Sequence, residues 1–191
     1  MDYKGDILYI EQVLAGKINA FSYLVDRHKD KAYNLAFRIC GNHEEAEEIA
    51  QDSFLKAYRS LGRFKMKSSF ATWLYRIVYN TAISQVRIKK KGILSLEDFP
   101  ADANDFIGSN SSEEEAEKEY RSSLLNFALQ KINEEERGLI SLYYYEDMSI
   151  EEISDVTGIG KSNIKVRMFR ARQKMLEIIE KVEKNKLIYH E

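Results

Sequence analysis

Apolar residues along the 191-residue chain recur every three or four positions, a spacing that predicts α-helices. The clearest stripe consists of Phe70, Trp73, Leu74, Ile77 and Thr81. Strand signals are weak, because Tyr143-Tyr144-Tyr145 has β propensity but lies inside a helical pattern. We therefore predict an all-α chain in which Phe70, Trp73 and Ile77 belong to the core.

Helix starts are marked by a capping residue followed three positions later by Glu. These pairs are Asn42 with Glu45, Ser112 with Glu115, Asn133 with Glu136, and Ser149 with Glu152. The helix after Asn42 is expected to run to about Leu61, and Ser69 is expected to cap the helix that carries the aromatic stripe.

One segment interrupts the helical pattern. The single proline, Pro100, lies in an acidic and polar stretch that has no apolar periodicity. We predict two small helical bundles at residues 1–91 and 113–186, joined by an acidic flexible linker at 92–112 and followed by a tail at 187–191.

Composition narrows the class of protein. Apolar residues are 44% and charged residues 31%, which suits a folded soluble protein. One Cys and three His, far apart in sequence, predict no disulfide framework, no metal site and no cofactor. No signal peptide and no apolar run of membrane-spanning length is present, so we expect a cytoplasmic protein without membrane insertion.

Charge is strongly segregated despite a net charge of −2. Residues 1–91 carry a net charge of +6, residues 92–120 carry −8, and residues 121–191 are neutral. The 44 residues between Asp52 and Glu97 contain ten Lys or Arg, seven aromatic residues and no acid. Residues 160–176 contain six basic residues and no acid. Two basic zones separated by an acidic segment indicate a nucleic-acid partner.

The second basic zone has the pattern of a helix-turn-helix. A helix at 149–157 with Ile150, Ile153 and Val156 inward is followed by the turn Gly158-Ile159-Gly160. The next helix starts near Ser162 and has a core stripe of Ile164, Met168, Ala171, Met175, Ile178 and Val182. Its other faces carry Lys161, Asn163, Lys165, Arg167, Phe169, Arg170 and Arg172. Such a helix suits the major groove of duplex DNA, and the alternative is a solvated basic face.

The first basic zone interleaves cations with rings, as proteins that bind single-stranded nucleic acid do. Phe64 lies in an expected loop between Arg63 and Lys65 and is the ring least explained by a core. Asn80 could bind a base edge through its amide, or could simply be an exposed helical Asn. Arg87 and Lys89-Lys90-Lys91 could bind phosphates or favour the helix dipole.

Two runs in each half resemble a known family. Gln51-Asp52-Ser53-Phe54-Leu55-Lys56-Ala57-Tyr58 and Phe70-Ala71-Thr72-Trp73-Leu74-Tyr75-Arg76-Ile77 resemble region 2 of a bacterial RNA polymerase sigma factor. Ser149-Ile150-Glu151-Glu152-Ile153 and Lys165-Val166-Arg167-Met168-Phe169-Arg170-Ala171-Arg172 resemble region 4. Since no full region 3 separates them, the chain is similar to the extracytoplasmic function subgroup.

The resemblance implies a role for each zone. Gln51, Asp52, Phe54, Lys56 and Ala57 would dock on core RNA polymerase. Phe64, Lys65, Asn80 and Arg87 would bind the melted strand of the −10 promoter element. Lys161, Ser162, Asn163, Lys165, Arg167, Phe169 and Arg170 would bind the −35 duplex. An inhibitory anti-sigma partner and a stress-responsive role in transcription initiation are further expectations.

Other functions fit fewer features. A helix-turn-helix regulator that binds only duplex DNA explains residues 149–172 but not the aromatic and basic stretch at 54–91. A helical interaction protein without nucleic acid explains neither. An enzyme is not expected, since the sequence contains no recognisable nucleophile–base pair, carboxylate dyad or phosphate-binding glycine loop.

Overall fold

The computed structural model describes residues 3–92 and 113–188, and these residues are almost entirely helical, with no strand among them. The N-terminal half contains α1 (Tyr3–Leu14), η1 (Ile18–Ala20), α2 (Phe21–Cys40), α3 (His43–Ser60), η2 (Leu61–Arg63) and α4 (Phe70–Gly92). The C-terminal half contains α5 (Glu113–Lys131), α6 (Glu134–Tyr144), α7 (Ile150–Thr157) and α8 (Lys161–Ile188). The all-α prediction is confirmed.

The predicted helix starts are confirmed wherever the structure describes them. Asn42 accepts a hydrogen bond from the amide of Glu45, at 2.9 Å. Ser69 accepts one from the amide of Thr72, also at 2.9 Å. Complete capping boxes begin α6 at Asn133 and α7 at Ser149. Residues 93–112 of the predicted linker, Ser112 included, lie outside the described residues, and Gly92 is the last residue of α4.

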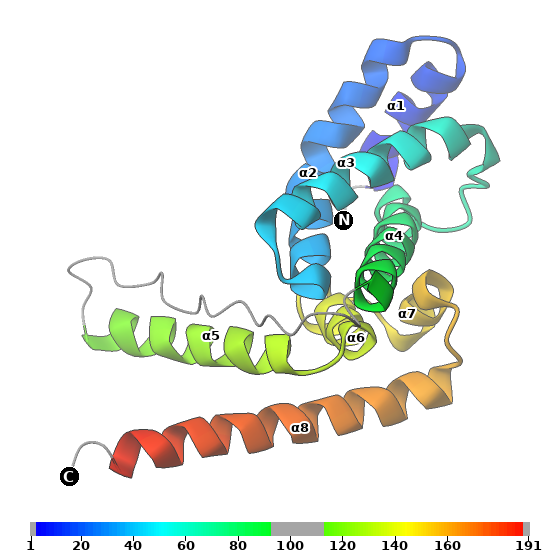
Figure 1. Cartoon of the computed structure of the whole chain (residues 1–191). Helices are drawn as coiled ribbons and strands as arrows, with labels where there is room; N and C mark the ends of the chain where they lie inside the picture. The colour runs from blue at the N-terminus through cyan, green and yellow to red at the C-terminus, as the bar shows by residue number, and fades with distance from the viewer. Residues whose placement is uncertain (1–2, 93–112, 189–191) are drawn as a thin grey trace.

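The core of the N-terminal half forms where α2, α3 and α4 pack together (Figure 1). Leu35 and Ile39 of α2, Ile49 of α3, and Leu74 and Val78 of α4 are fully buried in it. The stripe predicted on α4 contributes as expected, because Phe70 is buried and Trp73 and Ile77 pack against the same cluster.

The C-terminal half is joined to this core by direct packing. Helix α6 packs on α2 and α4, and α7 packs on α4 (Figure 1). Leu139, Leu142, Ile153 and Val156 belong to the same buried cluster as the helices of the first half. The two predicted bundles therefore share one continuous core.

A smaller cluster holds the other side of the C-terminal half together. Leu129 and Ile132 meet Ile140 of α6 and Ala171 of α8 there. In Figure 1, α5 and α8 run side by side, with α8 below α5 and α6. Helix α6 thus lies between the N-terminal bundle and α8.

Candidate nucleic-acid interface

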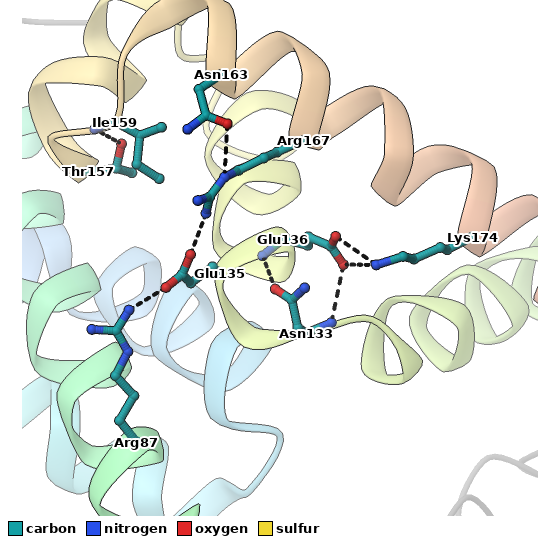
Figure 2. Close-up of polar contacts among 9 residues, drawn as sticks. All are labelled: Arg87, Asn133, Glu135, Glu136, Thr157, Ile159, Asn163, Arg167 and Lys174. Carbon is teal, nitrogen blue, oxygen red and sulfur yellow. Dashed lines mark hydrogen bonds and ion pairs between the residues drawn. The ribbon is translucent and has the colours of Figure 1, made fainter.

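A tightly bonded turn connects α7 to α8. Gly158 ends α7 with φ of 74°, a left-handed conformation that glycine adopts without strain. The hydroxyl of Thr157 accepts from the amide of Ile159 at 3.2 Å, as Figure 2 shows. The hydroxyl of Ser154 donates to the carbonyl of Ile159 at 2.8 Å. These bonds fix the angle between the two helices, and the predicted helix-turn-helix is present.

The buried stripe of α8 determines which face of the helix is open. Ile164, Met168 and Ala171 are buried, while Met175, Ile178 and Val182 are half-buried. The exposed residues of the first turns include Lys161, Ser162, Asn163, Lys165, Phe169 and Arg170. This is the arrangement that a recognition helix requires, with polar and basic side chains at the N-terminal end.

Arg167 differs from the other expected −35 residues, because two nitrogens of its guanidinium donate hydrogen bonds to side chains of the same chain. Its Nε donates to Asn163 Oδ1 at 3.1 Å, and its Nη1 donates to the carboxylate of Glu135 on α6 (Figure 2). Lys161 pairs with Glu151 at 2.9 Å on the surface. The hydrogen bond from Lys161 lowers the pKa of Glu151.

A second carboxylate on α6 holds α8 in place further along. Glu136 accepts from Lys174 Nζ through both oxygens, at 2.8 and 3.1 Å. The same carboxylate completes the capping box with Asn133, as Figure 2 shows. One side chain therefore sets both the start of α6 and its contact with α8.

The loop before α4 carries two of the four expected −10 residues, Phe64 and Lys65. Lys65 is exposed, and Asn80 is exposed on α4. Phe64 is half-buried, with its ring centroid 5.0 Å from that of Trp73 and 6.2 Å from that of Phe70. The prediction that Phe64 is the ring least explained by a core was therefore only partly right, because the ring packs against the core through Trp73 and Phe70.

Arg87 lies near the end of α4, where it donates to the carboxylate of Glu135 (Figure 2). Its neighbour Lys90 donates to Glu134 Oε2 at 2.5 Å. Burial raises the pKa of Glu134, but the hydrogen bond from Lys90, a backbone hydrogen bond and the charges of Lys90 and Arg137 together outweigh it, so that pKa is lowered. Two cations of the first basic zone are thus paired with acids of the C-terminal half.

The expected docking residues on α3 divide into two groups. Gln51 and Lys56 are exposed and Asp52 is half-exposed, and Lys56 pairs with Asp52 at 2.7 Å. Phe54 and Ala57 are buried in the core of the N-terminal half. The expected direct contact with a partner does not fit these two, whereas Leu55, which is 53% exposed, lies on the solvent side of α3.

The residues that join the two halves do not stand out in the sequence. Glu135 binds Arg87 and Arg167 together, and Glu146 is buried against Tyr75. Gly138 lies where a Cβ atom would be 2.5 Å from the Tyr79 ring. A glycine inside a helical pattern was the available signal of a close approach.

Two further findings apply to the described residues only. None of the helices there combines the length and the apolarity that a bilayer span requires. No group of three His, Cys, Asp or Glu residues in residues 3–92 and 113–188 is arranged to hold a metal ion.

Comparison with known proteins gives matches in both halves. Residues 24–92 match the model of Sigma-70 region 2, and residues 123–175 match that of Sigma-70, region 4. The ECF RNA polymerase sigma factor SigW of Bacillus subtilis (strain 168) is 32% identical over 176 residues, covering 86% of this chain and 91% of that protein. The RNA polymerase sigma-H factor of Pseudomonas aeruginosa is 31% identical, covering 86% of this chain and 88% of that one.

Two solved structures share the fold. The structure of CnrH in complex with the cytosolic domain of CnrY has a TM-score of 0.64 at 23% identity and covers 91% of this chain and 96% of that one. The sigma factor RpoE of Bartonella quintana, solved in complex with the anti-sigma factor NepR, has a TM-score of 0.63 at 23% identity, covering 84% of this chain and 96% of that one.

Proposed function

The chain belongs to the ECF sigma factors of the sigma-70 family, and from this we propose how its residues divide the work of promoter recognition. It is a promoter-recognising sigma factor that directs core RNA polymerase to its start sites. The N-terminal half is the −10-binding half, and the C-terminal half is the −35-binding half. The chain itself performs no catalysis in this role and works in the cytoplasm, where polymerase and promoter DNA are.

The open face of α8 is the single observation that carries the proposal. A fixed turn and a buried stripe present Lys161, Asn163 and Lys165 at the N-terminal end of the helix. Side chains of this kind discriminate bases at about 1–3 kcal/mol for each good contact in the major groove. The exposed cations add affinity that falls as salt rises.

The second surface suits a single strand. The half-buried Phe64 ring is supported by Trp73 and Phe70, and exposed Lys65 lies next to it in sequence. A base stacked on a supported ring contributes about 1–3 kcal/mol. Capture of an unstacked base there offsets the few kcal/mol that unstacking costs, so binding itself promotes melting.

The exposed side of α3 docks on core polymerase, through Gln51, Asp52, Leu55 and Lys56. Phe54 and Ala57 contribute by holding this helix on the core. An anti-sigma factor is a further expected partner, because both nucleic-acid surfaces carry functional groups that a free protein must not leave active.

In vitro transcription tests the proposal. Core RNA polymerase is mixed with genomic DNA from the source organism, with and without the chain, and the 5′ ends of the transcripts are sequenced. New starts that share two upstream motifs support the sigma function. No new starts and no polymerase binding would refute it, and tight specific duplex binding by the chain alone would favour the simple helix-turn-helix regulator instead.

A further inference from the structure

Asn163 lies in the first turn of α8, where a recognition helix contacts base edges. It is exposed, whereas Arg167 is half-buried. Residues four positions apart in a helix are neighbours on one face, and Arg167 Nε donates to Asn163 Oδ1 at 3.1 Å (Figure 2). A half-buried cation is therefore bonded to a polar side chain that faces solvent.

The bond determines how the Asn163 amide is turned. Every nitrogen of an arginine guanidinium is a donor, and none can accept a hydrogen bond. The atom that receives the bond from Arg167 Nε must therefore be the oxygen of the amide. The nitrogen Nδ2, which carries two N–H donors, lies at the other end of the amide, as Figure 2 shows.

Arg167 is itself bonded to α6. Its Nη1 donates to Glu135 Oε2, whereas Arg87 donates to the other oxygen of that carboxylate. Helices α6 and α8 also share a buried apolar cluster that includes Ile140 and Ala171. All three residues of this bonded chain, from the carboxylate to the amide, belong to the C-terminal half, so that half retains the arrangement when it binds DNA.

The outward donor restricts which base edge Asn163 can bind. In the major groove guanine presents two acceptors, N7 and O6, whereas adenine presents one acceptor and one donor. Asparagine binds adenine by donating to N7 and accepting from the N6 amino group, which requires both ends of the amide at the base. Because Arg167 engages Oδ1, the amide presents its donors to the groove, and two acceptors suit it best.

We propose that Asn163 selects a G·C pair in the −35 duplex by donating from Nδ2 to guanine, and that Arg167 is a positioning residue that holds the amide in this orientation. Arg167 determines the choice of base through Asn163, without contacting a base itself. This inference rests on the proposed function, because the placement of α8 in the −35 duplex comes from it.

Base preference is measured by selection from a pool of duplexes that contain a randomised segment. One arm uses the chain bound to core polymerase, and the other uses the chain alone, so a preference is recorded even without transcription. Asn163→Ala identifies the base pair that this residue reads, as the position where the preference is flattened. We expect the wild-type chain to favour G·C over A·T there by about tenfold or more.

A modified base tests the donated hydrogen bond directly. In 7-deazaguanine a C–H group replaces the N7 acceptor, while pairing with cytosine is kept. At the selected guanine we expect this analogue to weaken binding of the wild-type chain about fivefold or more. Binding of Asn163→Ala should not change between guanine and the analogue. The same analogue at a guanine outside both motifs is the control.

Arg167→Met tests the positioning role, because it removes every donor at this position and keeps a good helix former. Without Arg167 the Asn163 amide can turn and bind adenine through both ends. We expect most of the preference for G·C over A·T to be lost at the pair that Asn163 reads, and at no other pair. In the double variant Asn163→Ala/Arg167→Met the preference should match that of Asn163→Ala alone.

Arg172→Met is the matched control. It removes the same group from α8, but Arg172 donates to the carbonyl of Met168 at 3.3 Å and to the hydroxyl of Tyr144 at 3.2 Å. Loss of one cation lowers DNA affinity at every sequence. Both arginine variants share that loss, and only Arg167→Met should change the base preference. Thermal denaturation and binding to core polymerase show that each variant folds.

The outcomes separate the two proposals. A wild-type preference for A·T at the pair read by Asn163, or no flattened pair in Asn163→Ala, would overturn the guanine assignment. Unchanged preferences in Arg167→Met would reduce its bond to helix stabilisation, and loss of preference at a second pair would make Arg167 a base contact. Either result would overturn the positioning role.

The two arms also test the sigma function separately. Base selection by the chain alone, with no new transcription starts, would refute the sigma function, and the measured preference would still decide the role of Asn163. No base selection in either arm would overturn both proposals.

Discussion

The hydroxyl of Tyr75 on α4 donates a buried hydrogen bond to the carboxylate of Glu146, which lies 71 positions later in the chain. Burial raises the pKa of the Tyr75 hydroxyl, and the bond to Glu146 raises it further, so the phenol remains a donor at neutral pH. A hydrogen bond to a buried charge is among the stronger contributions to stability. The two halves of the chain are therefore joined by a specific polar contact as well as by apolar packing.

Loss of this donor should destabilise the packed chain. Tyr75→Phe keeps the ring in the core and leaves Glu146 with more distant cations. We expect the free energy of unfolding to fall by about 1.5–3 kcal/mol, measured by urea denaturation. Tyr23→Phe removes a hydroxyl from a tyrosine that is 57% exposed and should change little. Equal losses in the two variants would contradict the role given to Tyr75.

Local features of this fold were predictable because each depends on a few neighbouring residues. The capping boxes at Asn133 and Ser149 are determined by residue types three positions apart, and Gly158 ends α7 as expected. The inward residues Ile153, Ile164 and Met168 follow from periodicity in the same way. For this reason the candidate recognition helix could be predicted from the sequence.

The junction between the halves was not predictable by such means. In the sequence, Tyr75 is one residue of a run that resembles region 2, and Glu135 is the neighbour of the capping-box residue Glu136. Contacts between the halves depend on how the surface of one half fits the surface of the other. The apolar periodicity within either half does not specify this fit. Phe54 and Ala57 lie on the buried side of α3, and the resemblance of residues 51–58 to a docking motif does not distinguish that side from the exposed one.

Acidic pH should weaken the attachment of α1 to α2. His28 is buried on α2, with Nε2 3.1 Å from Asp6 Oδ2, and Arg27 and Lys31 are nearby. Burial lowers the pKa of His28 from its ordinary 6.5, although Asp6 opposes this. Because the pKa of His28 is lower in the folded chain than in the unfolded chain, its contribution to the free energy of unfolding is fully present above pH 6.5. This contribution is lost as the pH falls through the pKa of His28 in the folded chain.

His28→Gln tests this dependence, because glutamine keeps a donor for Asp6 but does not titrate. We expect the wild-type free energy of unfolding to fall below pH 6.5, by at most about 1.4 kcal/mol per pH unit from this proton. The variant should show a shallower fall over the same range. His43 is exposed, so His43→Gln is the control, and a wild-type profile in His28→Gln would contradict the assignment.

Two exposed lysines near opposite ends of α8 form a matched pair for mutation. Lys165 is exposed near the N-terminal end of α8, and Lys181 is exposed near the other end. Lys165→Ala should reduce promoter-directed transcription about tenfold or more if it contacts a base, with unchanged thermal stability. If it contacts only a phosphate, the slope of log affinity against log salt should fall by about 1. Lys181→Ala should do neither, and equal effects would refute a specific role for Lys165.

Strand capture at the other surface depends on a ring, because half-buried Phe64 packs against Trp73 and Phe70 and keeps part of its surface in solvent. Phe64→Leu keeps apolar packing against Trp73 but removes the stacking surface. We expect permanganate reactivity of unpaired thymines at the −10 element to fall about tenfold, which corresponds to about 1.4 kcal/mol of stacking, within the range for one base. Binding to core polymerase should be unchanged, since α3 is untouched. Val25 is half-buried and packs against the same core, so Val25→Leu controls for general repacking. Because melting and polymerase binding are measured on one preparation, wild-type permanganate reactivity in Phe64→Leu would assign this ring to the core and leave the −10 strand to Asn80 and Lys65.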